Sequence, residues 1–325
     1  MPLATRLTDC LDIRHPVLLA PMGSIAGGRL AAAVTAAGGL GLIGGGYGDP
    51  EWLEREFAAA GNHRVGCGFI TWSLARRPEL LTQALARAPA AIMLSFGDPR
   101  PFAPAIRAAG AKLICQVQSL AHVEDALAAG AEIIVAQGSE AGGHGATRAT
   151  LPLVPQVVDR VRERAPDAMV VAAGGIGDGR GLAAALMLGA EGVLVGTRFY
   201  ASEESLARPQ AKARMIEATG EETIRTSVFD TARGITWPKQ FTGRALNNDF
   251  ARRWHGAEAE LSAAAEREMA RYQAAAAVGD FSTAVIFGGE VMGLFDRVLP
   301  AREIVERMVA QAEAALRAGA QRIAN

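Results

Sequence analysis

Eight short apolar stretches, none of them interrupted by polar alternation, constrain the fold of this chain more than any other feature. They are rich in Val, Ile and Leu, which is typical of strands covered on both faces in a parallel sheet. Ala-rich segments with helical spacing lie between them, and several end in a Gly that favours a left-handed helix cap. The stretches are residues 16–22, 40–46, 65–71, 91–96, 112–117, 132–138, 169–175 and 192–199.

A strand followed by a helix, repeated eight times, predicts an α/β fold of the (β/α)₈ TIM barrel type. A doubly wound open sheet is the alternative. Against it, the GxGxxG match GLGLIG falls inside a predicted strand and not in a strand-to-helix turn. We expect the barrel over residues 1–220, a smaller, mainly helical appended segment over 221–290 that covers the substrate, and a C-terminal helix within 291–325 that packs on the barrel.

The composition excludes several classes of partner. Lys and Arg number 33 against 34 Asp and Glu, so no basic excess is present to neutralise a nucleic acid. No apolar run reaches the roughly 18 residues that cross a bilayer, and no secretory signal is visible. The three cysteines and five histidines lack the spacing of a disulfide framework or a metal site. These features predict a cytoplasmic protein without nucleic-acid, membrane or metal partners, and they leave a homo-oligomer open.

The residues that end the apolar stretches are the candidates for a site. Active sites of TIM barrels form at the C-terminal ends of the strands. Most of these residues are small or neutral and polar, which suits a flat, uncharged ring across the barrel mouth better than a metal or a sugar. They are Pro21, Met22, Gly23, Gln116, Gln137, Ala173, Gly174, Gly175, Gly196 and Thr197.

Two glycine-rich turns after the seventh and eighth strands give the sharpest pattern, AAGGIGDGRGL (172–182) and VGTRF (195–199). Gly lets the backbone approach an anion, and the following helix N-termini add positive potential. This fold repeatedly binds phosphate at these two loops. The simpler interpretation is that the glycines only make tight turns. The pattern favours a phosphate site.

His144 lies a few residues after the sixth strand, in EAGGHG, where Gly142, Gly143 and Gly145 surround it. An imidazole without neighbouring side chains can lean over a bound ligand, as a general base or hydrogen donor must. The alternative is a structural histidine that satisfies a loop. Glu140 either orients this imidazole or is solvated. We predict that His144 is catalytic.

These motifs closely resemble those of the nitronate monooxygenases, formerly called 2-nitropropane dioxygenases, over nearly the whole chain. EAGGHG together with GGIGDGRGL and GTRF is a specific combination, although FMN-dependent enoyl-acyl-carrier-protein reductases and some NAD(P)H:quinone reductases share much of it. The resemblance implies a TIM barrel that holds FMN non-covalently, with a smaller second domain over the flavin.

The resemblance also implies roles for the candidate residues. His144 matches the catalytic histidine of the family. Met22 and Gly23 would lie along the isoalloxazine, and Gln116 and Gln137 would hydrogen-bond its polar edge or ribityl chain. The implied FMN-binding set is Pro21, Met22, Gly23, Gln116, Gln137, Gly142, Gly143, Ala173, Gly174, Gly175, Gly196 and Thr197, of which Gly174, Gly175, Gly196 and Thr197 would hold the phosphate.

One position departs from the family pattern. Many relatives have Asn near the end of the third strand, where this chain has Gly68. The difference removes a polar contact near the flavin and leaves the substrate pocket, with Trp72 nearby, undefined.

The activity implied by the resemblance is oxidation of alkyl nitronates by dioxygen to carbonyl compounds and nitrite. His144 would supply a donating group to the nitronate anion, or would remove the α-proton if the substrate is a neutral nitroalkane. A reductase that uses NAD(P)H and FMN to reduce a quinone or an enoyl thioester is the second hypothesis. A phosphate-binding barrel without redox chemistry is the third.

Overall fold

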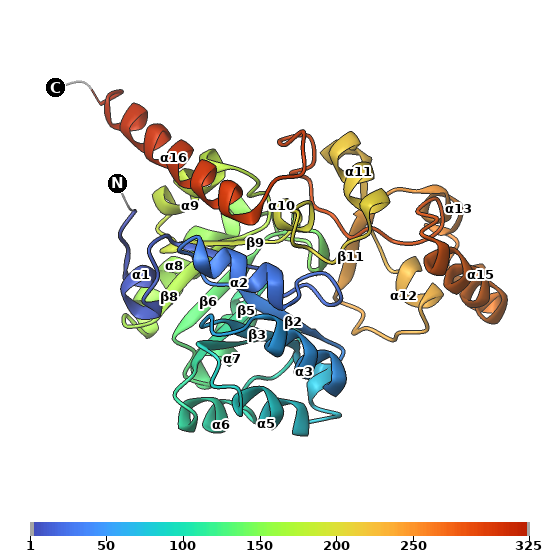
Figure 1. The fold of residues 1–325 in the computed structure, drawn as a ribbon, viewed down its shortest axis with the longest axis horizontal. Helices are drawn as coiled ribbons and strands as arrows, with labels where there is room; N and C mark the ends of the chain where they lie inside the picture. The colour runs from blue at the N-terminus through green and yellow to red at the C-terminus, as the bar shows by residue number, and fades with distance from the viewer. Residues whose placement is uncertain (1–2, 324–325) are drawn as a thin grey trace.

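The computed structural model describes residues 3–323 and confirms the TIM barrel (Figure 1). Its eight parallel strands are hydrogen-bonded in the order β1-β9-β8-β6-β5-β4-β3-β2. A parallel bridge between Leu18 and Leu40 joins the two ends of this order and closes the barrel. Each predicted apolar stretch contains one strand: β1 (Val17–Leu19), β2 (Leu42–Gly46), β3 (Gly66–Ile70), β4 (Ala91–Ser95), β5 (Lys112–Val117), β6 (Ile133–Gln137), β8 (Met169–Ala173) and β9 (Gly192–Val195).

Helices surround the barrel because the segments between strands carry an apolar face and defined caps. Asp49, Ser119 and Asp178 accept hydrogen bonds from backbone N–H groups in the first turns of α3, α7 and α9, which stabilises each helix start. The surrounding helices are α2 (Gly28–Ala36), α3 (Pro50–Ala59), α4 (Thr71–Leu74), α5 (Glu79–Leu85), α6 (Ala103–Ala108), α7 (Leu120–Ala128), α8 (Thr150–Arg164), α9 (Gly179–Met187) and α10 (Thr197–Tyr200).

Successive strand residues belong to two different hydrophobic clusters. Val17 and Leu19 pack in the outer cluster with the helices, whereas Leu18 packs in the inner one, as the twofold period of a strand requires. Leu7 and Leu11 of α1 (Arg6–Leu11) join the inner cluster and close the barrel end opposite the strand C-termini. The barrel interior is therefore a packed core, and only its C-terminal end is available for a site.

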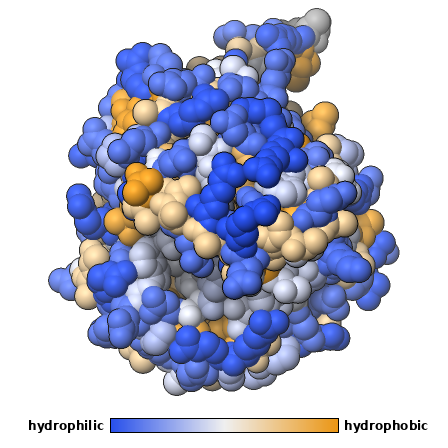
Figure 2. Space-filling view, turned by 90° about the vertical axis from the view of Figure 1, so that its right-hand side faces the viewer, coloured by the Kyte–Doolittle hydropathy of each residue, from blue (hydrophilic) through white to orange (hydrophobic). Residues whose placement is uncertain are grey.

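The chain after the barrel forms a second cluster of elements, at the right of Figure 1. Its apolar side chains, among them Phe229, Phe250 and Tyr272, pack in a hydrophobic cluster of their own. Figure 2 shows this side of the molecule as mainly hydrophilic, with apolar residues in small separate groups. The elements are α11 (Pro209–Glu217), η1 (Gly220–Glu222), β10 (Thr223–Thr226), α12 (Val228–Ala232), β11 (Thr242–Leu246), α13 (Asp249–Trp254), α14 (Glu258–Ala263) and α15 (Ala265–Val278).

The sequence analysis missed a small antiparallel sheet that joins this segment to the barrel. Strand β7 (Gly143–Gly145), which follows β6, pairs with β11, and β11 pairs with β10. His144 lies opposite Gly243 in this register. A three-residue strand rich in Gly has no periodicity to predict it. Because β7 belongs to the barrel half of the chain, the division at residue 220 stays a prediction.

Helix α16 (Ala301–Ala320) follows the last loop and packs against α9 and α2. Its buried face places Val305, Met308 and Ala312 in the outer cluster of the barrel. None of the helices in the described part of the chain is long and apolar enough to cross a membrane.

Candidate active site

One large cavity opens at the C-terminal ends of the strands and contains every residue that the sequence analysis selected. Its volume is about 240 Å³, against about 30 Å³ for the second cavity described. Its lining includes His144, Pro21, Met22, Gly23, Gln116, Gln137, Gly142, Gly143, Ala173, Gly174, Gly175, Gly196 and Thr197. The fold thus brings together residues from five strands and their loops.

The rim of this cavity next to β8 and β9 fits an anionic group. The backbone N–H groups of Gly175, Ile176 and Gly196 point to no acceptor among residues 3–323. Gly175 has φ +70°, and the atoms nearest to a Cβ there would be those of the Glu140 side chain, at 3.6 Å or more. The Thr197 hydroxyl accepts from the Gly289 N–H at 3.0 Å and keeps its proton free to donate. Free donors from two adjacent loops make a site for a phosphate.

The His144 imidazole is buried at the cavity wall and held by a carboxylate from the appended segment. Its Nε2 lies 3.0 and 2.9 Å from the two carboxylate oxygens of Asp230. Because a carboxylate only accepts hydrogen bonds, this contact assigns the proton to Nε2 and leaves a lone pair on Nδ1. Nδ1 has no partner among the described residues. The pair therefore presents one unprotonated nitrogen to a ligand.

Burial lowers the pKa of the His144 imidazole below its usual value of 6.5, and Arg233 and Arg225 lower it further, while Asp230 raises it. The sum is a pKa below the ordinary value, so the imidazole is neutral at pH 7. A neutral imidazole with a free Nδ1 can accept a proton, and the adjacent Asp230 carboxylate would stabilise the cation that forms.

Aromatic rings enclose the imidazole. Trp237 stacks on it, with ring centroids 3.5 Å apart and planes 5° apart. The indole Nε1 of Trp237 donates to the Tyr47 hydroxyl at 2.9 Å, and Phe287 lies 5.5 Å from the imidazole. These rings make the wall around His144 apolar and fix the plane of the imidazole.

The amides of the barrel strands connect to His144 through its backbone. The Gln137 side chain donates to the His144 carbonyl at 3.0 Å and accepts from Gln116 and Gln118 at 3.1 and 2.9 Å. Gln116 and Gln137 line the cavity as expected, whereas Gln118 was not selected. Part of the hydrogen-bonding capacity of Gln137 is thus used to position β7.

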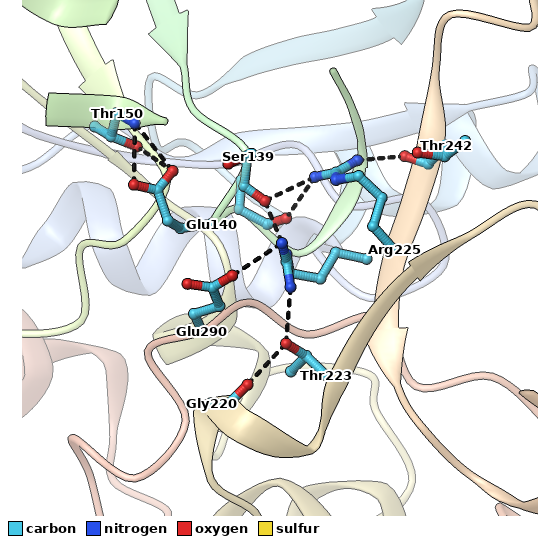
Figure 3. Close-up of polar contacts among 10 residues, drawn as sticks. Ser139, Glu140, Thr150, Gly220, Thr223, Arg225, Thr242 and Glu290 are labelled. Atoms are coloured by element: carbon cyan, nitrogen blue, oxygen red, sulfur yellow. Dashed lines mark hydrogen bonds and ion pairs between the residues drawn. The ribbon is translucent and has the colours of Figure 1, made fainter. Parts of the chain in front are cut away.

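Glu140 does not touch the imidazole, so the hypothesis that it orients His144 is wrong. Both its oxygens accept from the Thr150 N–H at 3.0 Å, and one also accepts from the Thr150 hydroxyl at 2.8 Å (Figure 3). Thr150 is the first residue of α8, and the residue before it, Ala149, has no polar side chain that could cap the helix. Glu140 therefore supplies the missing cap and anchors the loop that carries His144.

Two arginines hold the same loop from the other side (Figure 3). Arg225 of β10 donates to the carbonyls of Ser139 and Ala141, and Arg244 of β11 donates to Ser139 at 2.8 Å. Burial lowers the pKa of Arg225 to about 10, which still leaves it charged at pH 7. The loop before His144 is thus fixed by charge-assisted hydrogen bonds from the appended segment.

The structure explains the unusual Gly68. A Cβ at this position would lie 2.2 Å from Cγ of Pro21. The pyrrolidine ring of Pro21 therefore occupies the space that an Asn side chain would need. Gly142 is small for a related reason, because a Cβ there would approach Gly288 and Gly289 at 2.7 Å.

Sequence reasoning missed Asp230, Trp237, Tyr47 and Arg233. Asp230 follows His144 at a separation of 86 positions in the sequence, and no local periodicity links residues that far apart. The one available indication was the stretch TSVFDTARGITWPKQ, in which acidic, basic and aromatic residues interrupt an otherwise helical region. Among residues 3–323, no group of three or more His, Cys, Asp or Glu side chains could hold a metal ion.

The barrel, the anion rim and the polar amides define a class of protein, the TIM-barrel flavin oxidoreductases, and comparison with known proteins agrees. A family model described as nitronate monooxygenase matches residues 4–62 and 77–311. The chain belongs to the nitronate monooxygenase family. The match is interrupted over the stretch that contains Gly68 and Trp72.

Three relatives show how far the similarity extends. A nitronate monooxygenase of Neurospora crassa is 32% identical and covers 92% of this chain and 90% of its own. A (3aS,4S,5R,7aS)-5-hydroxy-7a-methyl-1-oxo-octahydro-1H-indene-4-carboxyl-CoA dehydrogenase of Mycobacterium tuberculosis is 30% identical, and the match covers 96% of this chain and 97% of the dehydrogenase. The solved structure of FabK from Thermotoga maritima superposes with a TM-score of 0.86 at 30% identity, covering 99% and 100%. The protein is therefore a flavin-dependent oxidoreductase.

Proposed function

We propose that the protein is an FMN-dependent enzyme that oxidises alkyl nitronates with dioxygen to carbonyl compounds and nitrite. The observation that carries the proposal is a single cavity that brings the His144 imidazole, hydrogen-bonded to Asp230 at 2.9 Å, together with the free backbone donors of Gly175 and Gly196. Membership of the family and the relative from Neurospora crassa support the same activity.

The free N–H groups of Gly175, Ile176 and Gly196 with the Thr197 hydroxyl would hold the FMN phosphate. Gln116 would face the polar part of the flavin. FMN, when bound, supplies the electron-accepting centre for the oxidation. The remaining predicted cofactor residues line the same cavity and stay assigned to FMN as predictions.

The chain itself orients the substrate and handles the proton. With a neutral nitroalkane, Nδ1 of His144 accepts the acidic α-proton, and Asp230 holds Nε2–H during the transfer. With a nitronate, no proton needs to be removed. Because the imidazole proton is on Nε2 and faces Asp230, Nδ1 cannot donate to the nitronate, and the expectation that His144 supplies a donating group does not fit this tautomer. Arg233, Trp237 and Phe287, all from residues 221–290, line the cavity, which supports the proposal that this segment covers the substrate and excludes water.

A second activity has one observation in its favour. The relative from Mycobacterium tuberculosis is named a dehydrogenase of a carboxyl-CoA thioester and covers almost the whole chain. A reductase or dehydrogenase that uses NAD(P)H or a thioester with the same flavin is therefore the competing proposal.

One experiment separates the two. The purified holoenzyme is incubated in air with a panel of alkyl nitronates while nitrite and carbonyl product are measured. Parallel samples receive NADH or NADPH with quinones or an enoyl thioester, and nucleotide oxidation is followed. We expect nitrite and carbonyl in equal amounts without added nucleotide. Nucleotide oxidation with acceptor reduction and no nitrite would replace the nitronate activity with the reductase.

A further inference from the structure

The cavity contains a cationic group that the reaction scheme above does not use. Arg233, at the C-terminal end of α12, is the one Lys or Arg side chain that lines the cavity, within the described range 3–323. Its guanidinium carbon lies 5.5 Å from the Tyr47 ring centroid and 5.6 Å from that of Phe287. The guanidinium is thus held between two rings, both of which also line the cavity.

The protein satisfies only part of the hydrogen-bonding capacity of Arg233. Its Nη1 is buried and has no hydrogen-bond partner in the described chain. The nearest carboxylate oxygen, Oδ1 of Asp230, is 4.0 Å away, and both Asp230 oxygens already contact His144. A buried cationic donor without an acceptor costs free energy unless a ligand supplies the acceptor.

Tyr47 offers a second donor beside it. Its hydroxyl accepts from Trp237 and has no acceptor of its own among residues 3–323, so its proton can be donated to a ligand. Burial raises the pKa of Tyr47 above its usual 10, so the hydroxyl keeps this proton at pH 7. The rings of Tyr47, Phe96, Trp237 and Phe287 line the cavity, so the wall beside this hydroxyl is largely apolar.

We propose that Arg233, with the Tyr47 hydroxyl, forms an anion subsite that binds the two oxygens of a small planar monoanion with an apolar tail and selects it over neutral analogues. The proposal rests on the proposed function, since an alkyl nitronate is such an anion. A planar guanidinium binds two oxygens of one group side by side. Arg233 thereby determines specificity, whereas His144 handles the proton.

The test uses a pair of ligands that differ only in charge. Isobutyrate has the charge, the number of heavy atoms and the planar two-oxygen head group of propan-2-nitronate but cannot be oxidised in this way, and isobutyramide is its neutral counterpart. Dissociation constants for both come from quenching of tryptophan fluorescence and from the perturbed visible spectrum of the holoenzyme at pH 8. We expect the wild-type protein to bind isobutyrate at least about 10-fold more tightly than isobutyramide.

Three variants make the test specific. Arg233→Met should weaken isobutyrate about 10- to 100-fold and leave isobutyramide nearly unchanged. Arg76→Met is the matched control, because Arg76 stacks on Trp72 at 5.0 Å but does not line the cavity; both constants should stay as in the wild type. Arg233→Lys keeps the charge without the planar fork and should weaken isobutyrate several-fold while the preference for the anion remains.

The relative affinities for isobutyrate and isobutyramide decide whether Arg233 forms an anion subsite. Equal affinities for the two ligands in the wild type, or an unchanged anion preference in Arg233→Met, would overturn the proposal. If Arg233→Met loses its flavin or fails to fold, unaltered isobutyrate binding by Arg233→Lys would overturn it instead. This test measures binding and no turnover. If the nitronate assay yields no nitrite but isobutyrate is still preferred over isobutyramide, the proposed reaction is wrong and the anion subsite stands.

Discussion

At the scale of single residues, Asp230 determines what the His144 imidazole can do. Both oxygens of Asp230 contact Nε2, so the proton stays on that nitrogen and Nδ1 is left with a free lone pair. Trp237 stacks on the ring and prevents it from turning. A histidine in a glycine loop would otherwise be free to change both its tautomer and its orientation.

Replacing either member of this pair should separate catalysis from cofactor binding. His144→Ala should keep the flavin and lose at least about 100-fold in kcat with a neutral nitroalkane, because the base is removed. Asp230→Asn should lose activity as well, since an amide no longer fixes the tautomer. Flavin content is read from the visible spectrum. Unchanged turnover in His144→Ala would remove this residue from the mechanism.

The pH dependence should report the same imidazole. Burial holds the pKa of His144 below 6.5, so the base is unprotonated above that pH and gains a proton as the pH falls. For a neutral nitroalkane, kcat/KM should be constant at pH 7 to 8 and fall through an acid limb below pH 6.5. His122→Gln, at a half-buried histidine outside the main cavity, should keep this limb. A limb centred at or above pH 7 would contradict the neutral, buried imidazole.

At the scale of loops and elements, two segments shape the candidate site. They are the glycine rim after β8 and β9 and the loop between β6 and β7. In the rim, glycine leaves no side chain in front of the backbone N–H groups that we assign to the phosphate. The β6–β7 loop works because Glu140, Arg225 and Arg244 hold it on both sides.

A carboxylate in the rim should expel the cofactor. Gly175→Asp places a negative charge where a phosphate would lie, and we expect the purified protein to contain less than about a tenth of the wild-type flavin. Gly175→Ala is the control, because it has the same backbone strain at φ +70° without the charge. Flavin at the wild-type level in Gly175→Asp would contradict the phosphate assignment.

Removing one arginine from the loop should loosen the site without unfolding the barrel. Arg225→Met leaves the Ser139 and Ala141 carbonyls with fewer donors, at a cost of about 1–3 kcal/mol for each buried group left unsatisfied. Hydrogen exchange of residues 138–145 should become faster, and kcat should fall. Arg252→Met, at an exposed ion pair of α13, should change neither. Unchanged exchange in Arg225→Met would show that Arg244 alone fixes the loop.

At the scale of the whole molecule, the site depends on packing between distant parts of the chain. Helix α16 packs so closely on α9 that a Cβ at Gly179 would lie 2.3 Å from the Met308 carbonyl oxygen. Gln311 also accepts from the Gly179 N–H at 3.0 Å. Since α9 begins directly after the anion rim, the C-terminal helix supports the position of that rim.

A substitution that creates a cavity under α16 should therefore destabilise the fold and weaken cofactor binding. Met308 is 2% exposed, and Met308→Ala should lower the free energy of unfolding by about 2–5 kcal/mol in urea denaturation. Flavin affinity should fall in the same variant. Arg302→Ala, whose side chain is 78% exposed, should stay within about 0.5 kcal/mol of the wild type. A stable Met308→Ala protein would mean that α16 can be repacked.

The sequence by itself determined the barrel, the glycine rim and the position of His144. Each of these is a local property. An apolar stretch indicates a buried strand, and a Gly cluster after a strand indicates a turn that exposes backbone donors. Gly68 was also visible as a departure from the family, although its cause, the Pro21 ring, was not.

Only the tertiary structure decided which groups surround His144. Asp230, Trp237 and Arg233 lie in a segment with no periodic pattern, and they reach the imidazole because β11 pairs with β7. That pairing depends on contacts between residues about a hundred positions apart, which no local sequence pattern encodes. That His144 lines the cavity could be predicted from its neighbours in the chain, whereas its protonation, its orientation and the cation beside it could not.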